Sequence, residues 1–405
     1  MLQNRTKKLK RNIPLFYANF VFGKTGFWLP VLYFFLVELK SFNTVQALLL
    51  ISVISLSQSV FEVPTGVVAD KVSRRASVAI GMLIKAVCMS LLLPVQGFVT
   101  VFLCMAGIGL GKSFTSGADK SILYDTLKEL GEKKEYKKQL NLTSFFHFMM
   151  VGTTTLIGGL TGQIDLAIPI LLSSFSYIIA TISSLSFVEP KKSYEGEELS
   201  HENYLTHTKE AFRLIFSRKA FLGGVTLLFI ASTIMGAVLT SNKNIIAPVF
   251  EALSVNIAFV GIATSIIYFT KSIGAYIASR LNKDGGEFKE ISFGLIIYMI
   301  SLLFLFAFQK PVVGIVVFAL FGSMHPLINS NFDKLINDRV PSNKRATVLS
   351  MQSLIKQMLA TGFLAMFGVV LSTYHLGAGL IYIISIIFVV LVLFVINRKL
   401  LIKQK

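Results

Sequence analysis

Five lysines and one glutamate lie within long apolar segments, where charged side chains could bind a solute or carry a proton. A charge at the centre of a membrane-spanning helix costs at least about 2.5–3.5 kcal/mol, so it is expected to face a wet cavity or a partner. Ammonium groups attract anions, and a desolvated carboxyl group can take up and release a proton. These residues are Lys24, Lys85, Lys112, Lys271, Lys356 and Glu62.

Two polar stripes accompany these charges. Ser52, Ser55, Ser59, Glu62 and Gly66 recur at spacings of three and four, which places them on one helix face. Glu62 is the candidate for proton coupling, and the alternative is a fixed ion pair with a nearby lysine.

The second stripe has strict four-residue spacing and comprises His325, Asn329, Asp333 and Asn337. We expect a hydrogen-bonding face that lines a cavity. No second cluster of metal ligands accompanies His325, so neither a metal nor a cofactor is predicted.

The stretch "AGIGLGKSFTSGADKS" around Lys112 ends like a phosphate-binding loop. Such a loop needs a glycine six positions before the lysine and a preceding strand. Ala106 occupies that position, and the segment lies inside an apolar run. We therefore predict that Gly107 and Gly111 allow close helix packing instead.

The elements that carry these residues are apolar runs of about 20 residues, long enough to cross a hydrocarbon core of about 30 Å. The 405 residues are 54% hydrophobic and 15% charged, whereas soluble chains carry about 25% charged residues. We predict an all-α membrane protein with twelve transmembrane helices. The predicted spans are 13–37, 44–69, 75–95, 99–124, 142–163, 166–188, 220–249, 256–280, 290–309, 311–337, 346–371 and 375–397.

Lys and Arg are distributed asymmetrically between the two sides of these spans. About 30 of the 39 fall at the termini and in alternate connections, whereas the opposite loops hold only Lys40 and Lys310. Because positive residues remain inside, we predict a multi-pass protein of the cell inner membrane with both termini cytoplasmic. The net charge of +18 then faces anionic lipid rather than nucleic acid.

The chain has a two-part organisation. The polar linker 189–219 separates predicted six-helix bundles at 1–188 and 220–405. "GVVADKVSRR" after span 2 echoes "GAYIASRLNK" after span 8, and "ADKSILYD" in span 4 echoes "FDKLIND" in span 10. Such pseudo-symmetric repeats are typical of secondary transporters. The linker predicts an amphipathic surface helix with apolar positions at Tyr204, Ala211, Leu214 and Ile215.

"GVVADKVSRR" resembles the signature of the major facilitator superfamily in its loop between spans 2 and 3. "FEVPTG", "SGADKSILYDTLK", "FVEPK" and "PSNKRATVLS" resemble a bacterial branch rich in efflux proteins. Ser73 replaces the usual glycine, which we expect to weaken the turn. Charge pairing at this loop can hold one access state shut, and topogenic charge is the alternative for its arginines. The predicted gating residues are Gly66, Asp70, Lys71, Arg74, Arg75, Asp119 and Asp333.

The resemblance also implies that spans 1, 4, 7 and 10 line a central cavity, with spans 2, 5, 8 and 11 beside it. The predicted substrate-binding residues are then Lys24, Lys112, Lys271, Lys356, His325 and Asn329. Their positive field attracts anions and repels lipophilic cations. Internal pairing, for example of Lys271 with Glu62, is the alternative. Lys85 is expected to be structural, Lys243 to reach a membrane edge, and Trp28 and Tyr33 to face lipid.

These observations predict a secondary active transporter rather than an enzyme. It would move a small anionic or zwitterionic organic solute by alternating access, in proton-coupled export as an antiporter. The alternatives are an importer of an anionic nutrient or metal-chelating carboxylate, and a multidrug efflux pump. The expected partners of this monomer are the solute, a proton or other coupling ion, and membrane lipids.

Overall fold

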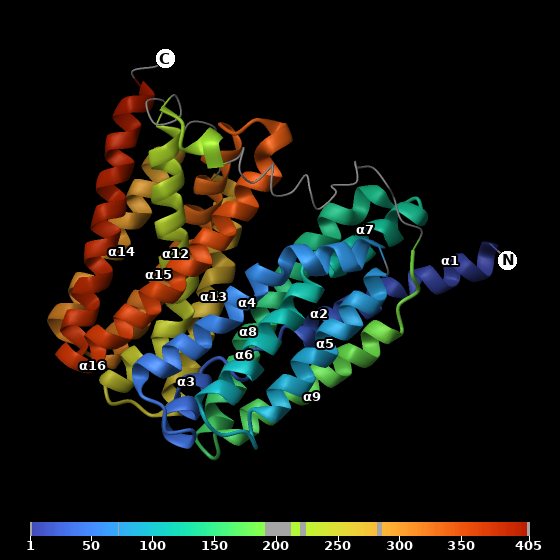
Figure 1. Cartoon of the computed structure of the whole chain (residues 1–405), viewed down its shortest axis with the longest axis horizontal. Coiled ribbons are helices and arrows are strands. Elements are labelled where there is room, and N and C mark those ends of the chain that lie inside the picture. Colours follow the sequence, from blue (N-terminus) through green and yellow to red (C-terminus); the bar gives the residue numbers. More distant parts are fainter. Residues whose placement is uncertain (1, 72, 191–211, 219–223, 282–285, 403–405) are drawn as a thin grey trace. The chain divides into compact units, whose positions relative to one another are not determined.

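The computed structural model is a helical protein (Figure 1), and no strand occurs in the part that it describes. Helices satisfy their own backbone groups, as apolar surroundings require. The chain divides into two compact units, Met1–Glu195 with Asn256–Ser265, and Gly196–Val255 with Ile266–Lys405. The described residues are 2–71, 73–190, 212–218, 224–281 and 286–402.

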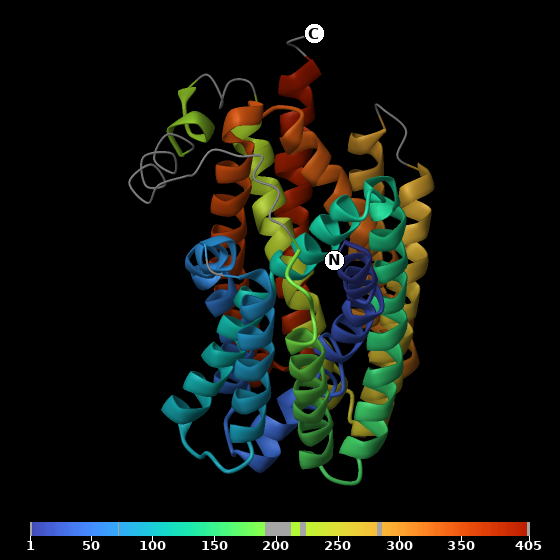
Figure 2. The same ribbon diagram turned by 90° about the vertical axis from the view of Figure 1, so that its right-hand side faces the viewer.

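The first unit contains the helices of the N-terminal half. Among them, α5 and α9 lie side by side (Figures 1 and 2), as do α4 and α6. Its elements are α1 (Leu2–Lys10), α2 (Asn12–Gly23), α3 (Leu32–Phe34), the π-helix η1 (Phe35–Leu39), α4 (Thr44–Lys71), α5 (Arg74–Leu91), α6 (Phe98–Thr115), α7 (Ala118–Glu129), the 3₁₀ turn η2 (Lys133–Glu135), α8 (Tyr136–Gly162) and α9 (Ala167–Leu185).

The second unit contains most of the helices of the C-terminal half. Figure 1 shows α16 folding back on itself, because His375 leaves the helical conformation with φ of 71° and divides the helix into two arms. The helices are α12 (Val225–Ala252), α13 (Ile257–Leu281), α14 (Glu287–Phe308), α15 (Pro311–Asn337) and α16 (Ser342–Ile402). The first nine residues of α13 group with the first unit.

Eight helices of the described part are long and apolar enough to cross a membrane. One of them, Thr347–Arg398, contains both of the last two predicted spans, and another, Phe98–Glu129, runs through α6 and α7. Predicted spans 1, 3 and 5 fall on α2 to η1, α5 and α8, which are not among the eight. The chain is a membrane-spanning protein, and the number twelve remains a prediction.

The linker prediction falls mostly outside the described residues, as do Tyr204 and Ala211. Within the described residues 212–218, Phe212 to Ile215 form a helical turn. Ile215 is buried and Leu214 half-buried, whereas Phe212 is exposed, so the apolar side chains of this turn do not all lie on its buried side.

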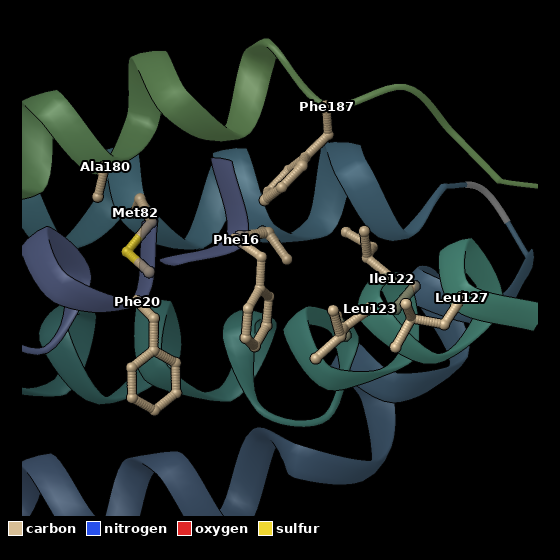
Figure 3. Packing of buried hydrophobic residues seen from close by; sticks show 11 residues of the cluster. Phe16, Phe20, Met82, Ile122, Leu123, Leu127, Ala180 and Phe187 are labelled. Carbon is tan, nitrogen blue, oxygen red and sulfur yellow. The ribbon is translucent and has the colours of Figure 1, made fainter. Parts of the chain in front are cut away.

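The core of the first unit is an apolar cluster between α2, α5, α7 and α9 (Figure 3). Phe16 and Phe20 of α2 belong to this cluster together with Met82 of α5 and Ile122 of α7. Helices α5 and α6 cross so closely that a Cβ on Gly81 would lie 2.5 Å from the Gly111 carbonyl oxygen. The predicted packing role of Gly111 is therefore confirmed.

The first predicted span is not the continuous helix expected from its length. Helix α2 ends at Gly23, and residues 24–31 form turns before α3 begins. Pro30 has no N–H to donate, and the backbone N–H of Gly26 donates to Thr154 Oγ1 at 2.8 Å instead of within a helix. The neighbouring helix α8 thus takes over hydrogen bonds that span 1 gives up.

The fourth predicted span is also divided. Helix α6 ends at Thr115, Ser116 is extended, and α7 begins at Ala118. Gly117 has φ of +79°, a conformation that costs little only for glycine. Two of the four spans that the family resemblance places at the cavity are therefore broken.

Candidate functional site

The two breaks of the first unit are joined by an ion pair. Lys24 directly follows the last residue of α2, and Asp119 lies in the first turn of α7. Lys24 Nζ lies 3.1 Å from Asp119 Oδ2, and it also lies 3.8 Å from the centroid of the Phe20 ring. The Asp119 side chain is 5% exposed and that of Lys24 is 31% exposed. The Lys120 backbone N–H donates to the other carboxylate oxygen, Oδ1, at 2.7 Å, so Lys24 supplies the one salt bridge of Asp119 among the described residues and the backbone adds a hydrogen bond.

A second lysine supports the break in span 1. Lys85 Nζ donates to the carbonyl oxygen of Gly23, the last residue of α2, and lies 4.0 Å from the centroid of the Tyr177 ring. The residue is 3% exposed. A cation at the C-terminus of a helix is stabilised by the helix dipole and satisfies a carbonyl that the helix leaves free. This position fits the structural role expected for Lys85.

Lys112 lies on α6 one turn before the break in span 4. Its Nζ is 5.3 Å from the centroid of the Trp28 ring, and Trp28 Nε1 donates to Tyr177 Oη at 3.0 Å. Trp28 is 6% exposed and Tyr33 1% exposed, so the expectation that these aromatics face lipid is wrong. The break in span 1 allows Trp28 to turn inward, where its indole N–H donates to Tyr177.

Glu62 on α4 contacts the same break. Its Oε1 accepts a hydrogen bond of 3.3 Å from Ser116 Oγ, and the side chain is exposed. One helical turn away, Thr65 and Ser113 join α4 to α6 through their hydroxyl groups at 2.6 Å. The candidate proton carrier thus touches the residue at which span 4 changes direction.

The loop between α4 and α5 is held by a carboxylate. Glu189 accepts hydrogen bonds from the backbone N–H groups of Arg74 and Arg75 and from Ser73 Oγ, while Arg74 pairs with Asp125 on α7. Ser73 is extended and caps α5 by accepting from the Ala76 N–H at 3.1 Å. The expected weakening of this turn by Ser73 is therefore wrong, because the turn uses a cap where glycine was expected.

For Gly66, Asp70 and Lys71, the other residues of the predicted gate, the described part of the structure gives no contact that bears on gating. Gly66 lies within α4, and a Cβ there would meet nothing within 4 Å. The backbone of Asp70 and Lys71 belongs to α4, whereas their side chains lie outside the described residues. Their predicted role in gating stays a prediction.

A group of basic residues gathers in the second unit. Lys243 on α12, Lys271 on α13 and Lys356 on α16 lie close enough for their charges to act on His325 of α15. Lys243 also acts on Lys271. His325 Nδ1 is buried and has no hydrogen-bond partner among the described residues. We call Lys243, Lys271, His325 and Lys356 the basic cluster.

One carboxylate lies near the basic cluster. Asp333 feels the charge of Lys356 and accepts a hydrogen bond of 2.8 Å from Asn329 Nδ2, so these stripe residues do share a helix face. Asp333 is exposed. The next residue, Lys334, instead pairs with Glu287 of α14 at 2.7 Å. Asp333 therefore compensates only part of the positive charge.

Sequence comparison decides the family. The sequence profile of the Major Facilitator Superfamily matches residues 15–355. The chain belongs to this superfamily. It is accordingly a membrane transporter and not an enzyme.

Known members of the Major Facilitator Superfamily support this assignment. An uncharacterized transporter of this type, YxaM from Bacillus subtilis (strain 168), is 23% identical over 211 residues, which is 51% of each chain. A mutant of the nucleoside transporter NupG has a similar structure, with a TM-score of 0.80 and 17% identity over 97% of this chain and 99% of NupG. A bacterial homolog of the lysosomal transporter Spinster, in an inward-facing form, has a TM-score of 0.65 and 14% identity, with 98% and 96% coverage.

The predicted site residues of this superfamily member thus fall into two groups. Lys24 and Asp119 meet at the breaks of the first unit, with Lys112 and Glu62 each beside one break. Lys271, Lys356 and His325 meet in the second unit with Lys243, which sequence reasoning placed at a membrane edge. Its position in α12, nine residues before the end of the helix, was the available signal.

Proposed function

We propose that this transporter exports a small anionic or zwitterionic organic solute in exchange for protons, and that the basic cluster binds the solute. The proposal rests on three lysines of separate helices, Lys243, Lys271 and Lys356, whose charges all act on His325, a residue with a buried Nδ1 atom. Each ammonium group is costly within a membrane-spanning helix. An anionic solute would compensate a charge that Asp333 offsets only in part.

The basic cluster also supports a negative charge on the solute. Four helices contribute, namely α12, α13, α15 and α16, so the charges lie on separate rigid elements rather than on one helix. A lipophilic cation brought to this place would meet like charge. A solute with a carboxylate, sulfonate or phosphate group would accept hydrogen bonds from the ammonium groups.

Proton coupling is proposed through Glu62. Its carboxyl group lies at the surface of the protein and contacts Ser116 at the break in span 4. When Glu62 is protonated, it loses its negative charge and can itself donate to Ser116, so the contact changes character with its charge. A link between this contact and the ion pair of Asp119, three residues later, would couple protonation to the geometry of the break.

The proposed direction of transport, export, rests on the glycines of span 5. Span 5 carries Gly152, Gly158, Gly159 and Gly162 but lacks the proline of the glycine-proline motif that the resemblance associates with antiporters, so the motif is only partly present. Gly158 lets the Phe27 carbonyl approach, since a Cβ there would lie 2.0 Å from that oxygen. The motif thus packs against the broken part of span 1.

The test is solute flux in proteoliposomes under imposed pH gradients, with a panel of organic anions, zwitterions, nucleosides and cationic dyes. We expect an imposed pH gradient to drive an anion or zwitterion against its own concentration gradient, in the direction opposite to the flow of protons. Lys271→Gln and Lys356→Gln should raise KM for it. Glu62→Gln should leave binding measurable and abolish the dependence of flux on the pH gradient.

Lys120→Gln is the matched control, because Lys120 is an exposed lysine of α7 next to Asp119 and outside the basic cluster. Transport of cationic dyes with unchanged KM in the cluster variants would refute the assignment of charge. Flux that ignores the pH gradient in the wild type would refute proton coupling, and uptake in inside-out and right-side-out vesicles gives the direction.

A further inference from the structure

An apolar groove lies within the second unit, between α12 and the two arms of α16. Its volume is about 550 Å³, within the range of about 300–1,000 Å³ typical of ligand pockets. Ser385 and Tyr382 are its polar residues. The groove is lined by Ile234 and Val238 of α12, Gly362 and Phe363 of the first arm, and Tyr382 and Val389 of the second arm.

The groove adjoins a member of the basic cluster. Lys356, Leu359 and Phe363 follow one another at spacings of three and four on the first arm, so they share a helix face. The latter two line the groove. The stem of Lys356 crosses to α12, where a Cβ on Gly236 would lie 2.8 Å from Lys356 Cδ, and Ala237 lines the groove. The stem of Lys356 therefore packs against α12 next to a residue that lines the apolar groove.

We propose that the transported solute is an anionic amphiphile, whose acid group binds at Lys356 and whose alkyl chain fills the groove. This inference rests on the proposed transport of anions and specifies the rest of the molecule. The positive charge of Lys356 favours a chain that ends in an anionic group. The volume of the groove is large enough for a flexible alkyl chain and exceeds what a single methyl group would need. Open space at Gly362, where a Cβ would meet nothing within 4 Å, leaves room for the chain.

The experiment measures KM for butyl, heptyl and decyl sulfonate in proteoliposomes, below their micelle-forming concentrations. Sulfonates remain ionised, so they do not cross the bilayer as neutral acids. In the wild type, we expect KM to fall up to about four-fold for each added methylene, the factor that corresponds to about 0.8 kcal/mol per buried methylene.

Substitutions then locate the chain. Gly362→Phe places a ring into open space in the groove and should remove most of the dependence on chain length, and so should Ser385→Phe on the other arm. Met366→Phe is the control, because Met366 is exposed one turn farther along α16 and does not line the groove. Lys356→Gln should raise KM for every chain length.

The flux measurements distinguish the binding of an alkyl chain in the groove from the transport of anions in general. Transport of short anions with no effect of chain length would overturn the groove assignment and leave the proposed function standing. A membrane lipid that occupies the groove would give that same result. Absence of flux for every sulfonate and every other anion would overturn both. Equal flux of alkyl trimethylammonium ions would overturn the role of Lys356.

Discussion

The ion pair between Lys24 and Asp119 makes an asymmetric prediction about stability. Lys24→Met leaves a carboxylate that is 5% exposed without its partner, whereas Asp119→Asn leaves a lysine that is 31% exposed and lies over the Phe20 ring. The lysine can still reach water, and the carboxylate cannot. We expect Lys24→Met to destabilise the protein more than Asp119→Asn does.

The magnitudes follow from burial. Removal of one partner of a buried ion pair costs about 3–5 kcal/mol, and we expect about 3 kcal/mol for Lys24→Met because the pair is only partly buried. Asp119→Asn should cost about 1 kcal/mol, the net value of an ordinary hydrogen bond. The double variant Lys24→Met/Asp119→Leu should recover most of the loss, because no charge is left buried.

The assay is thermal unfolding of the purified protein in one detergent at a fixed scan rate, followed by circular dichroism. The expected order of midpoints is wild type and double variant highest, then Asp119→Asn, then Lys24→Met. If Lys24→Met matches the wild type, or if Asp119→Asn unfolds at the lower temperature, the aspartate does not depend on this lysine. Lys120→Met controls for the loss of a positive charge near α7.

Three further substitutions test the breaks and the cap. Lys85→Met should lower the thermal midpoint, since it leaves the Gly23 carbonyl unpaired at a cost of about 1–3 kcal/mol; an unchanged midpoint would mean that Lys85 does not cap α2. Gly117→Ala should cost about 1–2 kcal/mol in the same assay, because alanine is strained at φ of +79°, whereas Gly362→Ala, within a helix, should not destabilise. Ser73→Ala should cost about 1 kcal/mol through loss of the α5 cap and Ser73→Gly only a few tenths; equal losses would remove the capping role.

The helical class and the membrane location followed from composition and apolar length alone, because lipid permits few backbone arrangements. Composition and apolar length did not predict the breaks at Lys24 and Ser116. Each depends on a partner distant in the chain: Thr154 of α8 accepts the N–H that Gly26 cannot use in a helix, and the α7 N-terminus is held through Asp119. Hydropathy reports how apolar a segment is and carries no information on such contacts.

Charge in apolar segments led to residues that interact with one another in the structure, yet it did not distinguish lysines that pair with a carboxylate from lysines that gather together. Lys24 pairs with Asp119, which is 95 residues away in the sequence. Lys243 was expected at a membrane edge because the predicted span ended six residues later, at 249, whereas α12 continues to Ala252. Its proximity to His325 depends on how α12 packs within its unit.

The two units use their lysines differently, and this difference bears on mechanism. In the first unit, Lys24 and Lys85 hold the ends of broken helices, each against a group that the break itself exposes. In the second unit, Lys243 acts on Lys271, and these two lysines and Lys356 all act on His325, so like charges gather there without a matching number of carboxylates among the described residues. An anion bound at the basic cluster, as proposed, would relieve that repulsion, so occupancy should stabilise the second unit. We expect the transported anion to raise the thermal midpoint of the wild type and not that of Lys271→Gln/Lys356→Gln, and equal shifts in both would place the anion elsewhere.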